Sequence, residues 1–225
     1  MTEVAPSVVI AIDGPSASGK STVARIVAQE LGAVYVDSGS LYRGMTWQCV
    51  RRGVDVEHAE AVVRCLEESK WDFFVEEGSM RFFIDGDAPG EAIRGADVTE
   101  KVSLVAALPE VRAFVLERLR SLRELGSLSI EGRDIGSAVF PDTPYKFYID
   151  CDPAERARRR SKDHAALGEA QEEQEVLASL QRRDEMDSTR KASPLQVALG
   201  AQVLDSTHLS AEQVAAEVLL VVRGA

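Results

Sequence analysis

One stretch near the amino terminus, "VVIAIDGPSASGKSTVARIV" at residues 8–27, decides how this chain is expected to fold. Five apolar residues, Val8–Ile12, lead into a loop that fits the pattern G-x-x-x-x-G-K-[ST] from Gly14 to Ser21. The apolar run is typical of a buried strand, and the apolar spacing after the loop predicts a helix that stops at Gly32. A strand, a glycine-rich loop and a helix in this order are typical of a site that holds a chain of phosphates.

The residue types of this loop suit polyphosphate chemistry. Glycines let the backbone wrap closely, so that several N–H donors point into one concavity, and the following helix adds its positive amino-terminal end. Lys20 can reach the β and γ phosphates of ATP, and Ser21 can offer its hydroxyl to Mg²⁺. A structural glycine turn would not explain a Lys-Ser pair at this place. The predicted ATP-binding residues are Gly14, Pro15, Ser16, Ala17, Ser18, Gly19, Lys20, Ser21 and Thr22.

Length, charge and cysteine usage exclude several other classes of protein. The 225 residues suffice for one domain with a sizeable core, and the net charge of −11 argues against a surface for polymeric nucleic acid or an anionic membrane. The start of the chain lacks a positively charged region, and no apolar run approaches the ~20 residues of a membrane span, so we expect neither a signal peptide nor a membrane protein. Cys49, Cys65 and Cys151 lack metal or disulfide spacing, which indicates the cytoplasm.

Five short apolar segments alternate with longer helical patterns, and this alternation predicts an α/β fold with a parallel five-stranded sheet flanked by helices. Asp152-Pro153 has the form of an N-cap followed by Pro at the first helical position, and Pro109 opens another helical stretch. The spacing of Ser210 and Gln213 predicts a capping box before the last helix. The expected strands are Val8–Ile12, Val34–Asp37, Leu128–Glu131, Lys146–Asp150 and Val203–Asp205.

One region departs from the alternation. Residues 71–84, "WDFFVEEGSMRFFI", have the pattern of two strands around a Glu-Gly-Ser turn, which is a β-hairpin. A hairpin does not suit a crossover between parallel strands. We therefore expect residues 54–97 to be an insertion between the second and third core strands.

The absence of asparagine narrows the choice among phosphate-loop proteins. It excludes the Asn-Lys-x-Asp loop that reads guanine in GTPases, and it excludes the catalytic-loop Asn of protein kinases, whose G-x-G-x-x-G loop is also missing. A motor ATPase would carry an acidic pair at the end of an apolar strand, but Cys151 follows Asp150. Small-molecule kinases remain.

Three polar clusters indicate an anionic acceptor. "DSGSLYR" (37–43) follows the second strand, "EGRDIG" (131–136) follows the third, and "RRDEMDSTR" spans 182–190. Ligands of parallel α/β sheets bind beyond the carboxyl ends of the strands, where Arg43 and Arg133 could neutralise a second phosphate. A single such cluster would be interpreted as a surface ion pair, but two beside a phosphate loop favour a binding site.

The chain resembles a known family, the bacterial cytidylate kinases, which are nucleoside-monophosphate kinases. The similarity runs in family order over nearly the whole chain. Ser38 and Ser40 lie in a loop that the family often writes with Thr and Ala, and "ALGAQ" before the last strand is unusual. The matching stretches are "IDGPSASGKST", "DSGSLYR", "SLVAALPEVR", "IEGRDIGSAVFPD", "ERARRR", "RRDEMDSTRKASPL" and "VLDST".

The resemblance implies a single kinase domain, residues 1–225, of the P-loop NTPase type. Its core would comprise residues 1–53, 98–155 and 191–225. The insertion at 54–97, with its small antiparallel β element, would be the monophosphate-binding region, and residues 156–190 would form a helical lid that closes over both nucleotides. The implied reaction transfers the γ-phosphate of ATP, with Mg²⁺, to CMP or dCMP.

The resemblance also assigns roles to residues at the acceptor. Ser103, Arg112 and Asp134 would recognise cytosine, since a carboxylate accepts from its amino group and uracil would place a carbonyl there instead. Arg183 and Asp187 would reach the ribose. The full set implied for CMP binding is Ser38, Arg43, Ser103, Arg112, Arg133, Asp134, Arg183, Asp187 and Arg190.

Catalysis would then consist of positioning and charge neutralisation, because the acceptor oxygen of CMP is already ionised and needs no general base. The implied catalytic residues are Lys20, Arg156, Arg159 and Arg160, with Ser21 as the metal ligand. The implied partners are ATP and CMP or dCMP, and we expect a monomer. Two alternatives stay open: a kinase of another small acceptor, such as adenylate or shikimate, and a nucleotide-binding module without turnover.

Overall fold

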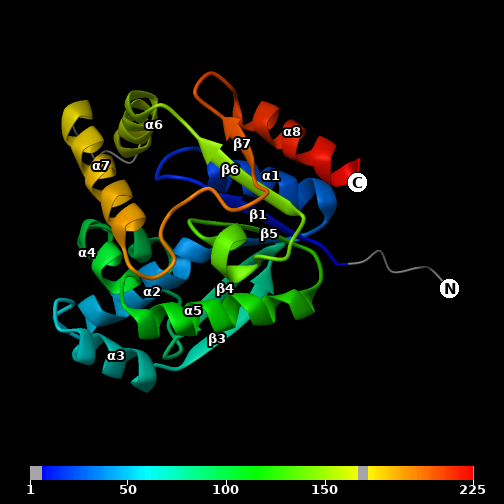
Figure 1. The fold of residues 1–225 in the computed structure, drawn as a ribbon. Coiled ribbons are helices and arrows are strands. Elements are labelled where there is room, and N and C mark those ends of the chain that lie inside the picture. The colour runs from blue at the N-terminus through cyan, green and yellow to red at the C-terminus, as the bar shows by residue number, and fades with distance from the viewer. Residues whose placement is uncertain (1–6, 167–171, 225) are drawn as a thin grey trace.

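The computed structural model describes residues 7–166 and 172–224, which form one sheet with helices on both faces (Figure 1). The strands lie in the order β3-β4-β2-β5-β1-β6-β7. Their bounds are β1 (Val9–Asp13), β2 (Val34–Asp37), β3 (Trp71–Glu76), β4 (Ser79–Ile84), β5 (Leu128–Gly132), β6 (Tyr145–Asp150) and β7 (Gln202–Asp205).

The five strands expected from the sequence make up the parallel part of this sheet. β1 lies between β5 and β6, while β2 and β7 pair in parallel with β5 and β6 respectively. Every residue of β1 is buried, because helices cover both faces of a parallel sheet. Each of these strands begins and ends within one residue of its predicted bounds, so the predicted α/β fold class is confirmed.

The predicted hairpin is present as β3 and β4, but it enlarges the sheet from five strands to seven. β4 pairs in parallel with β2 at Tyr35 and Ser79, and the Tyr35 N–H donates to the Gly78 carbonyl at 2.8 Å. Without this contact β2 would be an exposed edge strand with unpaired backbone groups. The hairpin therefore lies where the sequence places it along the chain and extends the core sheet.

Helices fill the two layers on either side of the sheet. α1 and α8 contact each other on one face, and α2, α4 and α5 lie together on the other (Figure 1). The α-helices are α1 (Lys20–Leu31), α2 (Ser38–Arg51), α3 (Ala59–Glu68), α4 (Ala96–Ala106), α5 (Pro109–Ser121), α6 (Pro153–Ala166), α7 (Glu173–Thr189) and α8 (Ala211–Arg223). Three short helical turns are η1 (Gly90–Arg94), η2 (Leu122–Leu125) and η3 (Ile135–Val139).

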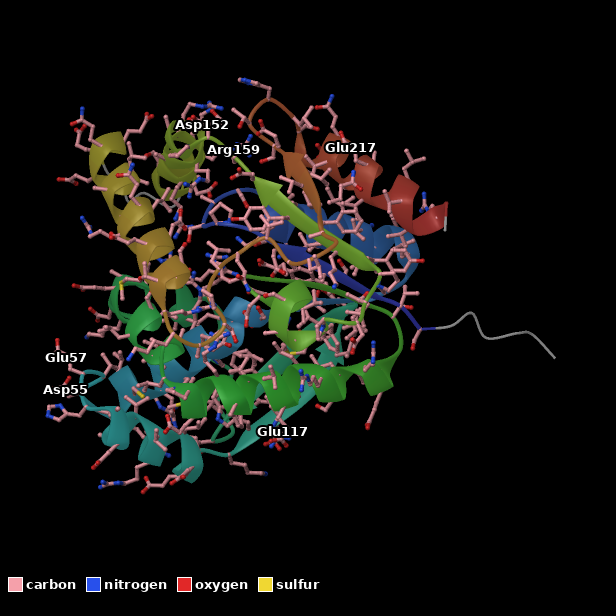
Figure 2. All side chains as sticks on the ribbon, in the orientation of Figure 1. Asp55, Glu57, Glu117, Asp152, Arg159 and Glu217 are labelled. Carbon is pink, nitrogen blue, oxygen red and sulfur yellow. The ribbon has the colours of Figure 1, made fainter. Side chains whose placement is uncertain are left out.

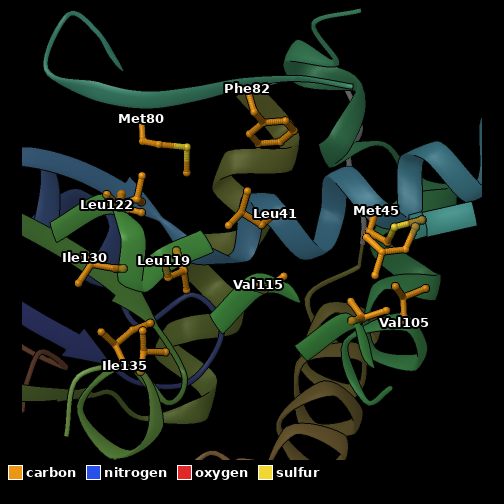
Figure 3. Packing of buried hydrophobic residues seen from close by; sticks show 14 of the residues in the cluster. Leu41, Met45, Met80, Phe82, Val105, Val115, Leu119, Leu122, Ile130 and Ile135 are labelled. Atoms are coloured by element: carbon orange, nitrogen blue, oxygen red, sulfur yellow. The ribbon is translucent and has the colours of Figure 1, made fainter. Parts of the chain in front are cut away.

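The core divides between the two faces because side chains of a strand alternate in direction. Ile10 and Ile12 of β1 pack with α1 and α8, whereas the opposite face buries Ile130 of β5 against α2 and α5. Leu41 of α2 and Leu119 of α5 belong to this second cluster (Figure 3). The two helical layers pack against β1 and β5. The phosphate loop directly follows β1, and the segment with Arg133 and Asp134 directly follows β5.

Helix starts agree with the sequence signals in three places, one of which is Pro109 at the first position of α5, and differ in one. The Asp152 carboxylate accepts from the Ala154 and Glu155 N–H groups at 2.8 and 3.2 Å, and Ser210 and Gln213 form the predicted capping box. The prediction of a loop at Ser38 and Ser40 was wrong, because α2 begins directly after β2. The Asp37 carboxylate caps this helix by accepting from the Ser40 N–H, so no loop is needed.

The lid predicted at 156–190 spans α6 and α7, which lie side by side at one end of the molecule (Figure 1); residues 167–171 fall outside the described residues. Their small apolar contact joins Ala157, Val176 and Leu180 to Ala17 of the phosphate loop. No helix of the described residues is long and apolar enough to cross a membrane. Charged side chains, Glu57, Glu117 and Glu217 among them, point outward around the molecule (Figure 2).

Candidate active site

A cavity of about 1090 Å³ opens at the carboxyl ends of β1, β2 and β5, where a parallel sheet is expected to bind ligands. The phosphate loop, α2, α4, α7 and the segment after β7 form its walls. Of the predicted site residues, those lining it are Ser16, Ala17, Ser18, Gly19, Lys20, Ser21, Thr22, Ser38, Arg43, Ser103, Arg133, Asp134, Arg159, Arg160, Arg183, Asp187 and Arg190. Those that do not line it are Gly14, Pro15, Arg112 and Arg156.

The phosphate loop has the geometry that its glycines suggest. A Cβ on Gly14 would lie 2.3 Å from the carbonyl oxygen of Ile149 on β6, so only glycine fits this close approach. Gly19 has a φ of +89°, which places it in the left-handed region at the start of α1. The amino terminus of α1 consequently faces the cavity, and its free N–H groups suit an anion.

Lys20 is more enclosed than the sequence suggested. Its side chain is 6% exposed, and Nζ donates to the Pro15 carbonyl at 2.8 Å and lies 3.9 Å from the Glu131 carboxylate. Burial lowers the pKa of Lys20, to about 7. Bound phosphates would restore the cationic form, since opposite charges within a few ångströms favour it.

Ser21 and Glu131 together offer oxygen ligands beside the loop. The Ser21 hydroxyl donates to Glu131 Oε1 at 2.5 Å, and burial raises the pKa of Glu131. Among the described residues no three or more His, Cys, Asp or Glu side chains gather into a metal cage. This donor set fits Mg²⁺, which is usually held by one or two protein oxygens together with substrate phosphates and water.

Asp134 forms a buried ion pair with Arg112 behind the cavity wall. The two side chains are 6% and 8% exposed, and Arg112 also donates to the Ala106 carbonyl at 3.2 Å. The Asp134 carboxylate lines the cavity, as does Ser103, so Arg112 fixes the direction in which that carboxylate points. The Tyr42 ring, which sequence reasoning missed, lies 5.4 Å from the Arg112 guanidinium and also lines the cavity.

The loop that carries Asp134 is anchored by Asp13, a residue the sequence analysis passed over. The Asp13 carboxylate accepts from the backbone N–H groups of Ile135 and Gly136 at 2.8 Å each. Asp13 is the last residue of β1, and burial raises its pKa to about 7. An acidic residue at the end of a buried strand was the signal available in the sequence.

Arginines concentrate in the acceptor half of the cavity. Burial, together with the charges of Arg43 and Arg133, lowers the pKa of Arg183 to about 10. Burial also lowers the pKa values of Arg43 and Arg190. In the part of the chain that the structure describes, Arg183 Nε and Arg190 Nη2 are buried without a hydrogen-bond partner. Clustered cationic groups that repel each other and keep buried N–H groups without a hydrogen-bond partner favour an anion.

Not every predicted acceptor residue presents a free polar group. The Ser38 hydroxyl donates to the Glu131 carbonyl at 2.7 Å, so it holds α2 against the end of β5. Asp187 accepts from Arg133 Nε at 3.0 Å and lies 3.5 Å from the Arg190 guanidinium. These contacts preorganise the arginines around the cavity.

The three lid arginines expected to act together take different positions. Arg160 lines the cavity, and Arg159, which also lines it, donates to the Ser206 carbonyl at 2.6 Å after β7. Arg156 instead lies behind the phosphate loop, where it donates to the Ser16 carbonyl at 3.0 Å and pairs with Asp184 at 2.5 Å. The four-residue spacing of Arg156 and Arg160 predicts a common helix face and cannot separate their environments.

Comparison with known proteins gives a consistent result. The family model described as cytidylate kinase matches residues 10–224. A protein named cytidylate kinase from Mycobacterium leprae (strain Br4923) is 41% identical over 217 residues, which cover 96% of each chain. A protein of the same name from Rhodococcus opacus (strain B4) is 40% identical over 96% of this chain and 95% of its own. Another from Clostridioides difficile (strain 630) is 39% identical over 95% of this chain and 97% of its own.

Proposed function

Since the chain belongs to the cytidylate kinase family, we propose that it transfers the γ-phosphate of ATP to CMP or dCMP and releases ADP with CDP or dCDP. The observation that carries this proposal is the buried Arg112–Asp134 pair and a group of arginines with unsatisfied buried N–H groups, which share one cavity with a phosphate loop. The phosphate loop suits ATP as the phosphate donor, and the arginines suit the phosphate of the acceptor. The Arg112–Asp134 pair suits a base that presents a hydrogen-bond donor and an acceptor side by side.

The donor side binds the phosphates of ATP through the loop from Ser16 to Thr22 and the amino terminus of α1. Lys20 contacts the β and γ phosphates. The Ser21 hydroxyl would hold Mg²⁺ in part, and the bound ion would supply positive charge that neutralises those phosphates. The buried position of Lys20 and the Ser21–Glu131 contact support this assignment.

The acceptor side divides among phosphate, ribose and base. Arg43, Arg133 and Arg190 bind the monophosphate, and Arg183 and Asp187 reach the ribose. The low exposure of these side chains and the lowered pKa values of three of the arginines support an anionic ligand in this half of the cavity.

The base is read by Ser103, Arg112 and Asp134. The Asp134 carboxylate accepts from the cytosine amino group, and arginine can donate to the neighbouring acceptors. A different base would leave a buried polar group unpaired, which discriminates strongly. The buried Asp134 carboxylate favours CMP over UMP, because uracil carries a carbonyl acceptor where cytosine carries its amino donor.

Transfer needs alignment and charge neutralisation more than proton chemistry. The acceptor phosphate oxygen is already ionised, and Arg159 and Arg160 add positive charge from α6. Lys20 and the acceptor arginines are all present, which argues against a module without turnover. We further propose a monomer in the cytoplasm, with core segments 1–53, 98–155 and 191–225, an acceptor insertion at 54–97 and a lid at 156–190 that excludes water on closing.

A panel of acceptors tests the proposal. ADP release from ATP and Mg²⁺ is measured with CMP, dCMP, UMP, AMP and shikimate in turn. We expect high activity with CMP or dCMP and much lower activity with the others. Equal or greater activity with AMP or shikimate would assign the chain to another acceptor, and no acceptor-dependent release would mean a binding module.

A further inference from the structure

Ser16 of the phosphate loop is bound at all of its polar atoms by three different parts of the chain. Its N–H donates to Asp184 of α7 at 3.1 Å, and its carbonyl accepts from Arg156 of α6 at 3.0 Å. Its hydroxyl accepts from Arg133, which follows β5, at 2.8 Å. Ser16 is buried, so these contacts fix both its backbone and its side chain.

Asp184 and Arg156 are the two charged partners that hold the backbone of Ser16. Their side chains are 16% and 7% exposed, and the Arg156 guanidinium also donates to the Cys151 carbonyl at 3.2 Å. Neither residue lines the cavity. The donors of Arg156 are directed at protein atoms, so both residues act on the loop from behind.

The same helix contacts the acceptor side one turn further along. Asp187, three residues after Asp184, accepts from Arg133 Nε at 3.0 Å. α7 therefore touches Ser16 directly through Asp184, and it touches the Ser16 partner Arg133 through Asp187. Arg183 on the same helix lines the acceptor half of the cavity.

We propose that Asp184 is a positioning residue, which sets the donor loop relative to the acceptor residues through Arg156 and Ser16 and contacts no substrate. The inference rests on the proposed phosphoryl transfer. Donor and acceptor oxygens must be held in line, and a misplacement of about 1 Å costs on the order of 100-fold in rate. The paired charges of Asp184 and Arg156 join α6, α7 and the loop at one residue, Ser16.

The test replaces Asp184 by Asn. The amide oxygen of Asp184→Asn can still accept from the Ser16 N–H, but Arg156 loses its buried counter-charge. We expect kcat to fall about 10- to 100-fold, as for a slight misalignment, while KM for CMP and for ATP changes less than about threefold. The matched control is Glu185→Gln, which removes one negative charge from an exposed position of the same helix and should keep wild-type kcat.

A second variant, Arg156→Lys, keeps the charge at position 156 but cannot reach three oxygens at once, so an intermediate loss of kcat is expected. Thermal melting shows whether Asp184→Asn folds. If it does not fold, Arg156→Lys takes its place as the test. Wild-type kcat in a folded Asp184→Asn or Arg156→Lys enzyme would overturn the inference, as would a raised KM with unchanged kcat. Wild-type protein that fails to phosphorylate CMP would instead refute the proposed function.

Discussion

Replacing Asp134 by Ala separates base recognition from stability. The Asp134 carboxylate is buried, pairs with Arg112 and lies 3.7 Å from the Arg190 guanidinium. Its removal takes away the proposed acceptor for the cytosine amino group and also leaves Arg112 without its counter-charge. The two effects have different magnitudes and different readouts.

The loss in recognition follows from the strength of a hydrogen bond to a charged group, about 1.5–3 kcal/mol. At about 1.4 kcal/mol per factor of ten, kcat/KM for CMP should fall roughly 10- to 150-fold. The value for UMP should fall less, because Asp134→Ala also removes the carboxylate that opposes the uracil carbonyl. The ratio of CMP to UMP activity should therefore narrow by about one to two orders of magnitude.

The loss in stability follows from breaking a buried ion pair, which costs about 3–5 kcal/mol. For a domain of this length about 1 kcal/mol shifts Tm by 2–4 °C, so Tm should fall roughly 6–20 °C. The assay measures kcat/KM for both nucleotides at saturating ATP, well below the Tm of the variant. Asp142→Ala, which removes one charge from an exposed position, is the control. A CMP-to-UMP ratio that stays within about threefold of wild type would refute the assignment of Asp134 to the base.

Three further predictions concern other parts of the site. Lys20→Ala should nearly abolish transfer from ATP to CMP while leaving the fold intact by circular dichroism; near-wild-type turnover would contradict the phosphate-loop assignment. The pKa of Asp13 is about 7 in the folded protein and 3.8 ordinarily. The free energy of unfolding should therefore fall as pH rises from about 4 to 7, because the unfolded chain releases this proton more readily than the folded protein. Urea unfolding measures this free energy at each pH. Relative to Asp13→Asn, the wild-type protein should lose up to about 1.4 kcal/mol of unfolding free energy per pH unit. If the two proteins showed parallel plots of unfolding free energy against pH, the raised pKa would be excluded. Hydrogen exchange across 156–190 should slow when a bisubstrate dinucleotide inhibitor binds, and unchanged exchange would argue against a closing lid.

The parts of the fold that could be predicted depend on short-range signals. A phosphate loop needs Gly14, Gly19 and Lys20 at fixed spacing, and a capping box needs Ser210 and Gln213 three residues apart, so each is readable from the sequence. Strands of a parallel sheet are continuous apolar runs, which is why their bounds were close to correct.

The parts that could not be predicted depend on partners far apart in the chain. The Ser16–Asp184 contact joins residues 168 positions apart, and no local spacing indicates it. The different environments of Arg156 and Arg160 arise from what lies opposite each residue, whereas helical spacing gives only their common face. The pairing of β4 with β2 likewise covers the edge of the sheet, and no pattern within either segment indicates it.

The attachment of the hairpin to β2 restricts which parts of the acceptor region can move. The Tyr35–Gly78 hydrogen bond makes β3 and β4 an extension of the core sheet, so these strands shift only with the core. The chain between β4 and β5 contains no strand of the sheet and consists of η1, α4, α5 and η2. Closure over a small acceptor is consequently left to the proposed lid at 156–190, while the hairpin stays in register with the core sheet.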